Sequence, residues 1–252
     1  MAELAAAEAR AKEALYRLGA AVFLYPTPEQ LTRLKEGAIR LDSGEGPLSP
    51  SLADLVGIIK RIRPSLSLPL EEAYCRLFRV NPPAPPYESH YIDKAGLGAG
   101  GIAATLEEEY ATVGLTPKPS LNEPPDHLSM EMEFLAHLSG KEAAAWEEWN
   151  PEVALDWREE RRGFLNRHLA QWLSLFQEKV LPNSPPTIYS SALRMAEELL
   201  AVEIERSPVK KSTRETCLNP VFSEPRDTRD EGSASILPHL CKGDRIKPSE
   251  QT

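Results

Sequence analysis

The chain has 252 residues, of which 41% are hydrophobic and 27% are charged, and its formal net charge is −9. This length and composition are typical of one soluble globular domain, with or without a tail. The acidic charge argues against a nucleic-acid-binding protein, which needs a clustered basic face, and leaves a basic peptide open as a partner.

The N-terminal stretch is rich in alanine, carries an acid already at Glu3 and has no continuous apolar segment, so we expect no secretory signal. No run in the chain approaches the roughly 18 to 20 apolar residues that a membrane-spanning helix needs. The three cysteines, Cys75, Cys217 and Cys241, are too few and too scattered for a disulfide framework. We therefore predict a cytoplasmic protein with reduced thiols and without stable insertion into a membrane.

Helical periodicity dominates the first 206 residues. The expected helices cover residues 3–24, 28–39, 52–62, 70–80, 102–113, 124–139, 142–149, 152–180 and 187–205. Thr27 and Gln30 have the spacing of a capping box, and Ser51 is the expected N-cap of the third helix. No segment shows the alternation of a strand. The sequence predicts an all-α fold, a single bundle of roughly eight to ten helices.

Three segments are not expected to be helical. Four prolines in residues 82–86 predict an extended, rigid connection. The glycines of residues 96–101 fit the spacing GxGxxG, but no strand precedes them, so a flexible linker is expected instead of a dinucleotide site. From residue 207 onward the chain is rich in proline and mixed charge, which predicts a helical domain over 1–206 and a mostly disordered tail over 207–252.

The stretch NEPPDHLSMEMEFL, residues 122–135, is the densest in functional side chains. Asn122 or Glu123 can cap a helix whose first turn holds the two prolines, and Asp126 suits the positive end of the helix dipole. Capping does not account for His127 and Glu131, which are four residues apart on the same helix as several apolar side chains. A buried polar network and a recognition surface both remain open.

A metal site is a further alternative for this stretch. Asp126, His127 and Glu131, together with Glu123, could serve a helical metal-dependent hydrolase. However, zinc needs three or four ligands, the HxxxE spacing supplies two, and the motif HExxH is absent. We therefore expect no metal and no bound cofactor, and no catalytic residue is assigned.

The same stretch resembles the signature of the TorD/DmsD/NarJ family of molybdoenzyme maturation chaperones, also called redox-enzyme maturation proteins. The matching residues here are Glu123-Pro-Pro-Asp126-His127-Leu128-x-x-Glu131-x-x-Phe134. Further similar blocks are Tyr74-Cys-Arg-Leu-Phe78, Pro85-Pro-Tyr-Glu-Ser89, Tyr110-x-x-x-Gly114-Leu115, and the late helix with Phe164, His168, Leu169 and Trp172. The resemblance covers about residues 10–205; the tail has no counterpart in these motifs.

The resemblance implies an all-helical cytoplasmic chaperone that is not an enzyme. Such proteins bind the N-terminal leader, often a twin-arginine signal, of a catalytic subunit that takes up bis-molybdopterin guanine dinucleotide, and they delay its export until the cofactor is inserted. Relatives can swap helices between protomers, so a monomer or a swapped dimer is expected, with residues 81–86 and 182–186 as hinges. The sequence does not identify the client enzyme, and a generic helical adaptor is a further alternative.

By family position, the resemblance implies a recognition face made of Asp126, His127 and Glu131, with Glu123 beside them. A second candidate patch consists of Tyr87, Glu88 and Ser89, which the rigid proline segment would present at little entropic cost. Carboxylates suit the basic part of a leader because arginine binds them through two parallel hydrogen bonds.

Overall fold

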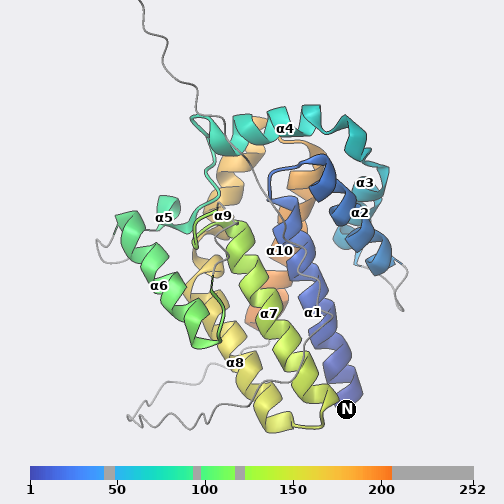
Figure 1. Ribbon diagram of the computed structural model, residues 1–252, viewed down its shortest axis with the longest axis vertical. Helices are drawn as coiled ribbons and strands as arrows, with labels where there is room; N and C mark the ends of the chain where they lie inside the picture. Colours follow the sequence, from blue (N-terminus) through green and yellow to red (C-terminus); the bar gives the residue numbers. More distant parts are fainter. Residues whose placement is uncertain (43–48, 93–97, 117–122, 206–252) are drawn as a thin grey trace, which may run out of the picture.

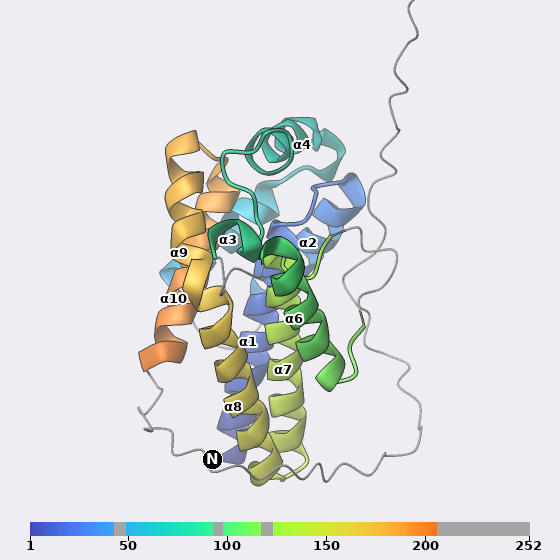
Figure 2. The same ribbon diagram turned by 90° about the vertical axis from the view of Figure 1, so that its left-hand side faces the viewer.

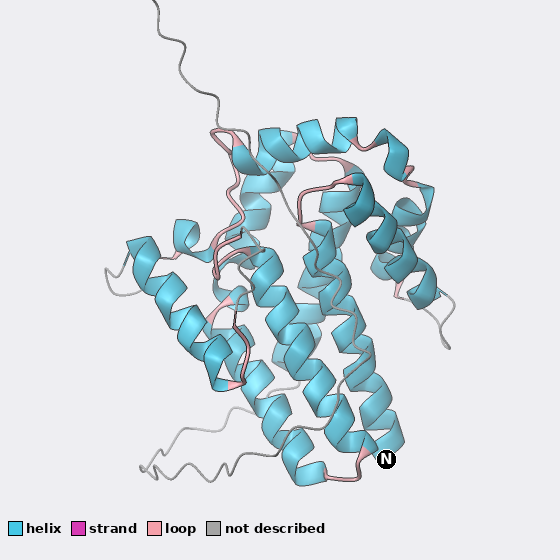
Figure 3. Ribbon diagram, in the orientation of Figure 1, coloured by secondary structure: helices cyan, strands magenta, loops and turns pink. Residues whose placement is uncertain are grey.

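The computed structural model describes residues 1–42, 49–92, 98–116 and 123–205. These residues form ten α-helices, two 3-10 turns and one π-helical turn, without a strand (Figure 3). The α-helices are α1 Ala2–Val22, α2 Pro28–Asp42, α3 Pro50–Arg61, α4 Leu68–Tyr74, α5 Glu88–Tyr91, α6 Gly98–Thr112, α7 Leu128–Glu147, α8 Pro151–Arg167, α9 Leu169–Val180 and α10 Thr187–Glu205. The predicted all-α class is confirmed. The predicted tail, with Cys217 and Cys241, lies outside the described residues.

The long helices run alongside one another. α1 packs along α7, α7 packs along α8, and α10 packs against α3, α1 and α9. α4 crosses one end of this bundle, and α6 lies on the far side of α7 from α1 (Figures 1 and 2). Within the described ranges, none of the helices combines the length and apolar character needed to cross a bilayer.

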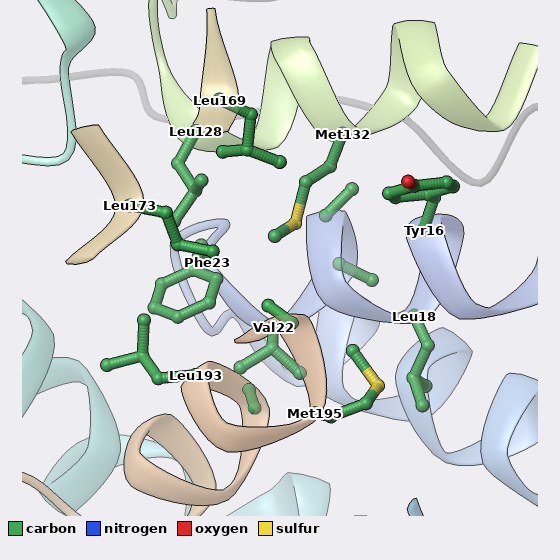
Figure 4. Close-up of a cluster of buried hydrophobic side chains, with 14 of the residues drawn as sticks. Tyr16, Leu18, Val22, Phe23, Leu128, Met132, Leu169, Leu173, Leu193 and Met195 are labelled. Atoms are coloured by element: carbon green, nitrogen blue, oxygen red, sulfur yellow. The ribbon is translucent and has the colours of Figure 1, made fainter. Parts of the chain in front are cut away.

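The core lies where the C-terminal end of α1 meets α7, α9 and α10. Phe23 and Leu193 lie among the apolar side chains drawn in Figure 4, and Met132 reaches into the same cluster from α7. Each large apolar side chain buried in this way contributes about 1.5–3 kcal/mol. Gly19 lets α1 and α7 approach closely, because a Cβ there would lie 2.8 Å from the sulfur of Met132.

The predicted division of residues 124–180 into helices is wrong at two places, for different reasons. Residues 124–139 and 142–149 were expected as separate helices, but α7 runs through Gly140. The carboxylate of Glu13 on α1 would lie 3.1 Å from a Cβ at that position, so the glycine serves close packing and not helix termination. The expected helix 152–180 breaks at His168, whose φ of −122° and ψ of −96° are not helical. No local sequence signal marks that break; the side-chain contacts of His168, described below, accompany it.

The caps also differ in part from expectation. Thr27 accepts a hydrogen bond from the backbone N–H of Gln30 at 3.1 Å, as in a capping box, but the Gln30 side chain donates to the carbonyl of Ala21 instead of returning to residue 27. The N-cap of α3 is Ser49 and not Ser51; Ser51 is buried and hydrogen-bonds to Glu198 on α10.

The predictions for the glycine-rich and proline-rich segments are confirmed only in part. Residues 98–101 form the first turn of α6, so the expected linker is wrong there, while 96 and 97 lie outside the described residues. Gly114 has φ +78° just beyond α6, which is the left-handed conformation expected of a glycine that ends a helix. The proline segment 82–86 is not helical, as predicted. The short helix α5 that follows it was not predicted.

A cluster of charged side chains, most of them buried, lies among α1, α7, α8 and α10. Arg161 on α8 is fully buried and forms ion pairs with Glu142 on α7 at 3.0 Å and Glu203 on α10 at 2.6 Å. Lys12 on α1 approaches Glu203 at 2.6 Å, and Arg158 approaches Glu142 at 2.7 Å. These five residues, named the ionic cluster below, join α1 and α10, which are far apart in sequence, to α7 and α8.

Candidate functional site

The two candidate patches from the sequence analysis lie side by side. Tyr87 and His127 form an antiparallel β-bridge. The backbone N–H of Glu88 donates to the carbonyl of Asp126 at 2.9 Å, and the N–H of Leu128 donates to the carbonyl of Pro86 at 2.9 Å. The rigid proline segment and the turn before α7 are therefore fixed to each other; residues 85–89 and 123–127 are named the paired loops.

The helix α7 begins later than predicted. Its N-cap is His127, whose Nδ1 accepts a hydrogen bond from the backbone N–H of Ser129 at 3.1 Å. The residues Glu123, Pro124, Pro125 and Asp126 precede the helix and form a turn, in which the N–H of His127 donates to the carbonyl of residue 124 at 3.0 Å. The prediction that Glu123 caps this helix is wrong, and Asn122 lies outside the described residues.

His127 is fully buried between the two loops. Because Nδ1 accepts from a backbone N–H, the proton of the neutral ring sits on Nε2. Nε2 lies 3.8 Å from a carboxylate oxygen of Glu123, and the ring packs edge-on against Tyr87 with 5.3 Å between ring centres. Burial, helped by the positive charge of Arg79, lowers the pKa of His127 to about 3, so the ring is uncharged at neutral pH.

Asp126 and Ser89 hold the first turn of α5. The backbone N–H of Ser89 donates to the carboxylate of Asp126 at 3.3 Å, and its hydroxyl donates to the same oxygen. Asp126 is 4% exposed. The hydroxyl of Tyr110 on α6 donates to the carbonyl of Pro125 at 2.8 Å, which attaches the turn to a third element. The Asp126 side chain therefore acts within the fold, as a cap for α5.

Glu88 and Glu131 are buried, and their carboxylates bond to His168 and Trp172. The indole N–H of Trp172 on α9 donates to both carboxylate oxygens of Glu131 at 3.2 Å. Nδ1 of His168 lies 2.7 Å from Glu88, and its Nε2 lies 3.1 Å from Glu109 on α6. When both glutamates are ionised, the two hydrogen bonds of His168 form together only if the ring carries a proton on each nitrogen.

Glu109 and Arg167 complete this set and were not singled out from the sequence. Burial acts to raise the pKa of Glu109, but hydrogen bonds from His168 and Arg167 bring it down to about 2. Arg167 bonds both carboxylate oxygens of Glu109, at 3.3 and 2.8 Å. A glutamate on a helix surface carries no local signal of such a role; the resemblance already included His168 and Trp172 but assigned them none.

Tyr87, Ser89 and Glu123 are the predicted site residues that are partly exposed. Tyr87 is half-buried, and the Glu123 side chain is 7% exposed beside the exposed Pro124. Burial raises the pKa of Glu123, an effect that the positive charge of Arg79 opposes. Arg79 is exposed, and its guanidinium lies 5.5 Å from the ring centre of Tyr25. Tyr87 and Glu123 are named the outer rim of the paired loops. The outer rim thus combines an aromatic ring with a carboxylate.

The predicted residues are together but do not converge on one point. The carboxylates of Asp126 and Glu131 accept from Ser89 and Trp172, and Nδ1 of His127 accepts from backbone. In the described part of the chain, no group of three or more His, Cys, Asp or Glu side chains is placed to hold one metal ion. The geometry therefore gives the metal-dependent hydrolase no supporting observation.

Comparison with known proteins gives matches to a family model, to sequence relatives and to a solved structure. The family model described as nitrate reductase delta subunit matches residues 42–178. A TorD chaperone from Vibrio cholerae is 32% identical over 156 residues, covering 60% of this chain and 69% of that protein. A perchlorate reductase assembly chaperone from Dechloromonas aromatica is 26% identical over 206 residues, covering 77% and 89%. A redox enzyme maturation protein from Archaeoglobus fulgidus, at 22% identity and TM-score 0.44, covers 75% of this chain and 93% of the solved chain.

Proposed function

This chain belongs to the nitrate reductase delta subunit family, and on that premise we propose that it is a maturation chaperone for a molybdenum-dependent oxidoreductase. The similarity to TorD chaperones and to a perchlorate reductase assembly chaperone supports this function. The predicted members of the family signature lie together at the paired loops, which supports the same conclusion.

The partner is the catalytic subunit of an enzyme that takes up bis-molybdopterin guanine dinucleotide. The chaperone binds the N-terminal leader of that subunit in the cytoplasm and holds the subunit until the cofactor is inserted, before export. The chaperone itself needs no cofactor for this role. The net charge of −9 favours a basic leader over an acidic one, because long-range attraction speeds the encounter.

The leader binds at the outer rim of the paired loops. An arginine of the leader pairs with the carboxylate of Glu123, and an apolar leader residue packs on the ring of Tyr87. A carboxylate oxygen of Glu123 lies 3.8 Å from Nε2 of His127, and the rings of Tyr87 and His127 lie 5.3 Å apart, centre to centre. Because both residues contact His127, they are fixed relative to each other. That arrangement is the observation on which this assignment rests.

The buried residues of the site act through position. Asp126, His127 and Ser89 hold the two loops together. Glu131 attaches them to Trp172 on α9, and Glu88 attaches them to His168, the residue between α8 and α9. A rim fixed before binding loses less entropy when the leader arrives. Substitution of a buried residue is therefore expected to loosen the rim, whereas substitution of Tyr87 or Glu123 removes contacts with the leader.

Affinity capture from the cytoplasm of the source organism tests the function. We expect the wild-type chain to retain a molybdoenzyme catalytic subunit, identified by mass spectrometry, and to lose it when that subunit lacks its leader. The folded variant Tyr87→Ala/Glu123→Gln is expected to lose the subunit as well. The variant Glu159→Gln, at an exposed position of α8, is the matched control. Capture that persists without the leader would contradict leader recognition, and failure to capture any molybdoenzyme subunit, where one is expressed, would contradict the chaperone function.

A further inference from the structure

A hollow between α1 and α2 is separate from the paired loops. Its volume is about 360 Å³, and its floor is apolar, with Leu18 and Leu34 among the lining side chains. Its polar lining consists of one glutamate, Glu13, and four arginines: Arg10, Arg17, Arg33 and Arg40. α2 lies on the opposite side of the molecule from α5 and α6 (Figure 1). A concentration of arginine is unexpected on a chain with a net charge of −9.

The arginines are regularly spaced. Arg10 and Arg17 are seven residues apart on α1, and Arg33 and Arg40 are seven apart on α2. Seven residues are two helical turns, so within each pair the positions are separated by roughly 10 Å along the helix axis. The hollow therefore presents positive charge at two levels, with apolar side chains between them.

The positive charge is only partly neutralised inside the protein. Arg10 bonds to Glu13 and Glu147, and Arg17 pairs with Glu13 at 2.8 Å. The Nε of Arg17 is buried without a hydrogen-bond partner. The side chain of Arg33 makes no hydrogen bond or ion pair with any residue that the structure describes. The lining contains four arginines and one glutamate, so it has a net positive charge that attracts anionic groups although Arg10 and Arg40 also have partners outside the lining.

Gly37 keeps the floor of the hollow open. It lies in the middle of α2, where glycine is less favourable than alanine. A Cβ at this position would meet nothing within 4 Å, so the packing of the chain does not require a glycine. The absent side chain instead leaves space between Arg33 and Arg40.

We propose that this hollow binds an acidic segment of a partner protein, with two carboxylate side chains about 10 Å apart and an apolar side chain between them. Arginine recognises carboxylates through paired hydrogen bonds. The spacing is too wide for a single phosphate to bridge both levels, but it fits glutamates at i and i+7 of a helix or at i and i+3 of a polyproline II segment, in which every third side chain lies on the same face. The site is independent of leader binding at the paired loops.

Selection from a displayed library of random peptides tests the proposal. Peptides selected on the wild-type chain and eluted by salt are expected to carry two acidic residues at one of these spacings around an apolar residue. Their affinity, measured by fluorescence anisotropy, should fall by about tenfold or more for Arg33→Glu/Arg40→Glu. It should not change for Arg61→Glu/Arg194→Glu, which makes the same change of charge at exposed positions of α3 and α10. Peptides without the acidic pair, or equal binding to both double variants, would overturn the proposal.

Two substitutions at Gly37 test the space in the hollow independently of charge. Gly37→Phe fills the opening and is expected to weaken binding of the selected peptides, whereas Gly37→Ala is expected to retain binding and raise the melting temperature.

Inorganic pyrophosphate as competitor distinguishes a site for small anions: if it binds more tightly than every selected peptide, the peptide site is refuted. Arg33→Glu/Arg40→Glu should still bind the client leader, so failure here is distinguishable from failure of the chaperone function.

Discussion

The ionic cluster and the paired loops are both buried and polar, but they are built differently. In the ionic cluster, Glu142 and Glu203 each face a guanidinium within 3.0 Å. At the paired loops and the adjoining first turn of α7, two carboxylates meet neutral donors: Asp126 accepts from Ser89, and Glu131 accepts from Trp172, whereas Glu88 faces His168. Neutral donors satisfy hydrogen bonding without cancelling charge. The first arrangement joins helices, whereas the second keeps negative charge near the rim where we place the leader.

The largest expected effect comes from the ionic cluster. Arg161→Met leaves Glu142 and Glu203 buried with less compensating charge, and loss of one partner from a buried ion pair costs about 3–5 kcal/mol. Urea unfolding should show this loss, while the folded fraction binds the leader as the wild type does. Arg162 is the control: its Nε lies 3.7 Å from Glu203 at the edge of the cluster, so Arg162→Ala should cost less than about 1 kcal/mol. Equal losses for the two variants would contradict the assigned roles.

A smaller effect is expected from Trp172→Phe. The substitution keeps an aromatic ring but removes the N–H that donates to both oxygens of Glu131, leaving a buried acceptor short of a donor. We expect the free energy of unfolding to fall by about 1–3 kcal/mol and leader affinity to fall with it, because the first turn of α7 loosens. Stability that falls without any change in leader affinity would separate Glu131 from the recognition site.

The pH dependence of stability provides a further test at His127. Its pKa of about 3 in the folded chain lies below the ordinary value of 6.5, so between these values the unfolded chain binds more protons. Stability must then rise with pH through this window and decline as pH falls toward 3. His127→Asn retains a good N-cap and removes the titration, so its denaturation midpoint should vary less between about pH 3 and pH 6.5. An unchanged slope would show that the ring is not buried and neutral.

The smallest expected effect concerns Glu109. Its pKa of about 2 is below the ordinary 4.5, so its contribution to stability is present above pH 4.5 and is lost as pH falls toward 2. Glu109 is partly exposed, and solvent screening limits this contribution to about 1 kcal/mol. Glu109→Gln should flatten the unfolding profile in that acid window and leave the profile above it parallel to wild type. A steeper profile for the variant would contradict the paired arrangement with His168 and Arg167.

Much of the fold could be predicted because its signals are local. The helix 187–205 was predicted with the bounds of α10, since apolar periodicity is a property of short segments. The continuity of α7 through Gly140 and the break at His168 depend on contacts with Glu13, Glu88 and Glu109, which come from elsewhere in the chain. No local pattern contains that information.

The residues that the sequence grouped do lie together, but their arrangement could not be predicted. The sequence placed His127 and Glu131 on one helix and left a buried network and a recognition surface open. Their complete burial follows from the bridge between Tyr87 and His127 and from the approach of Trp172, which are contacts between distant segments. The recognition role of these residues stays a prediction, which we now assign mainly to Tyr87 and Glu123.

The most direct test measures binding of the leader peptide of the captured client by fluorescence anisotropy. We expect Glu123→Gln to weaken the leader by about tenfold with an unchanged melting temperature, and Glu159→Gln to leave the affinity unchanged. Replacing the arginines of the leader by glutamine should remove the difference between wild type and Glu123→Gln. If Glu123→Gln binds the leader as tightly as the wild type does, the paired loops do not recognise its basic region, and the central claim is wrong.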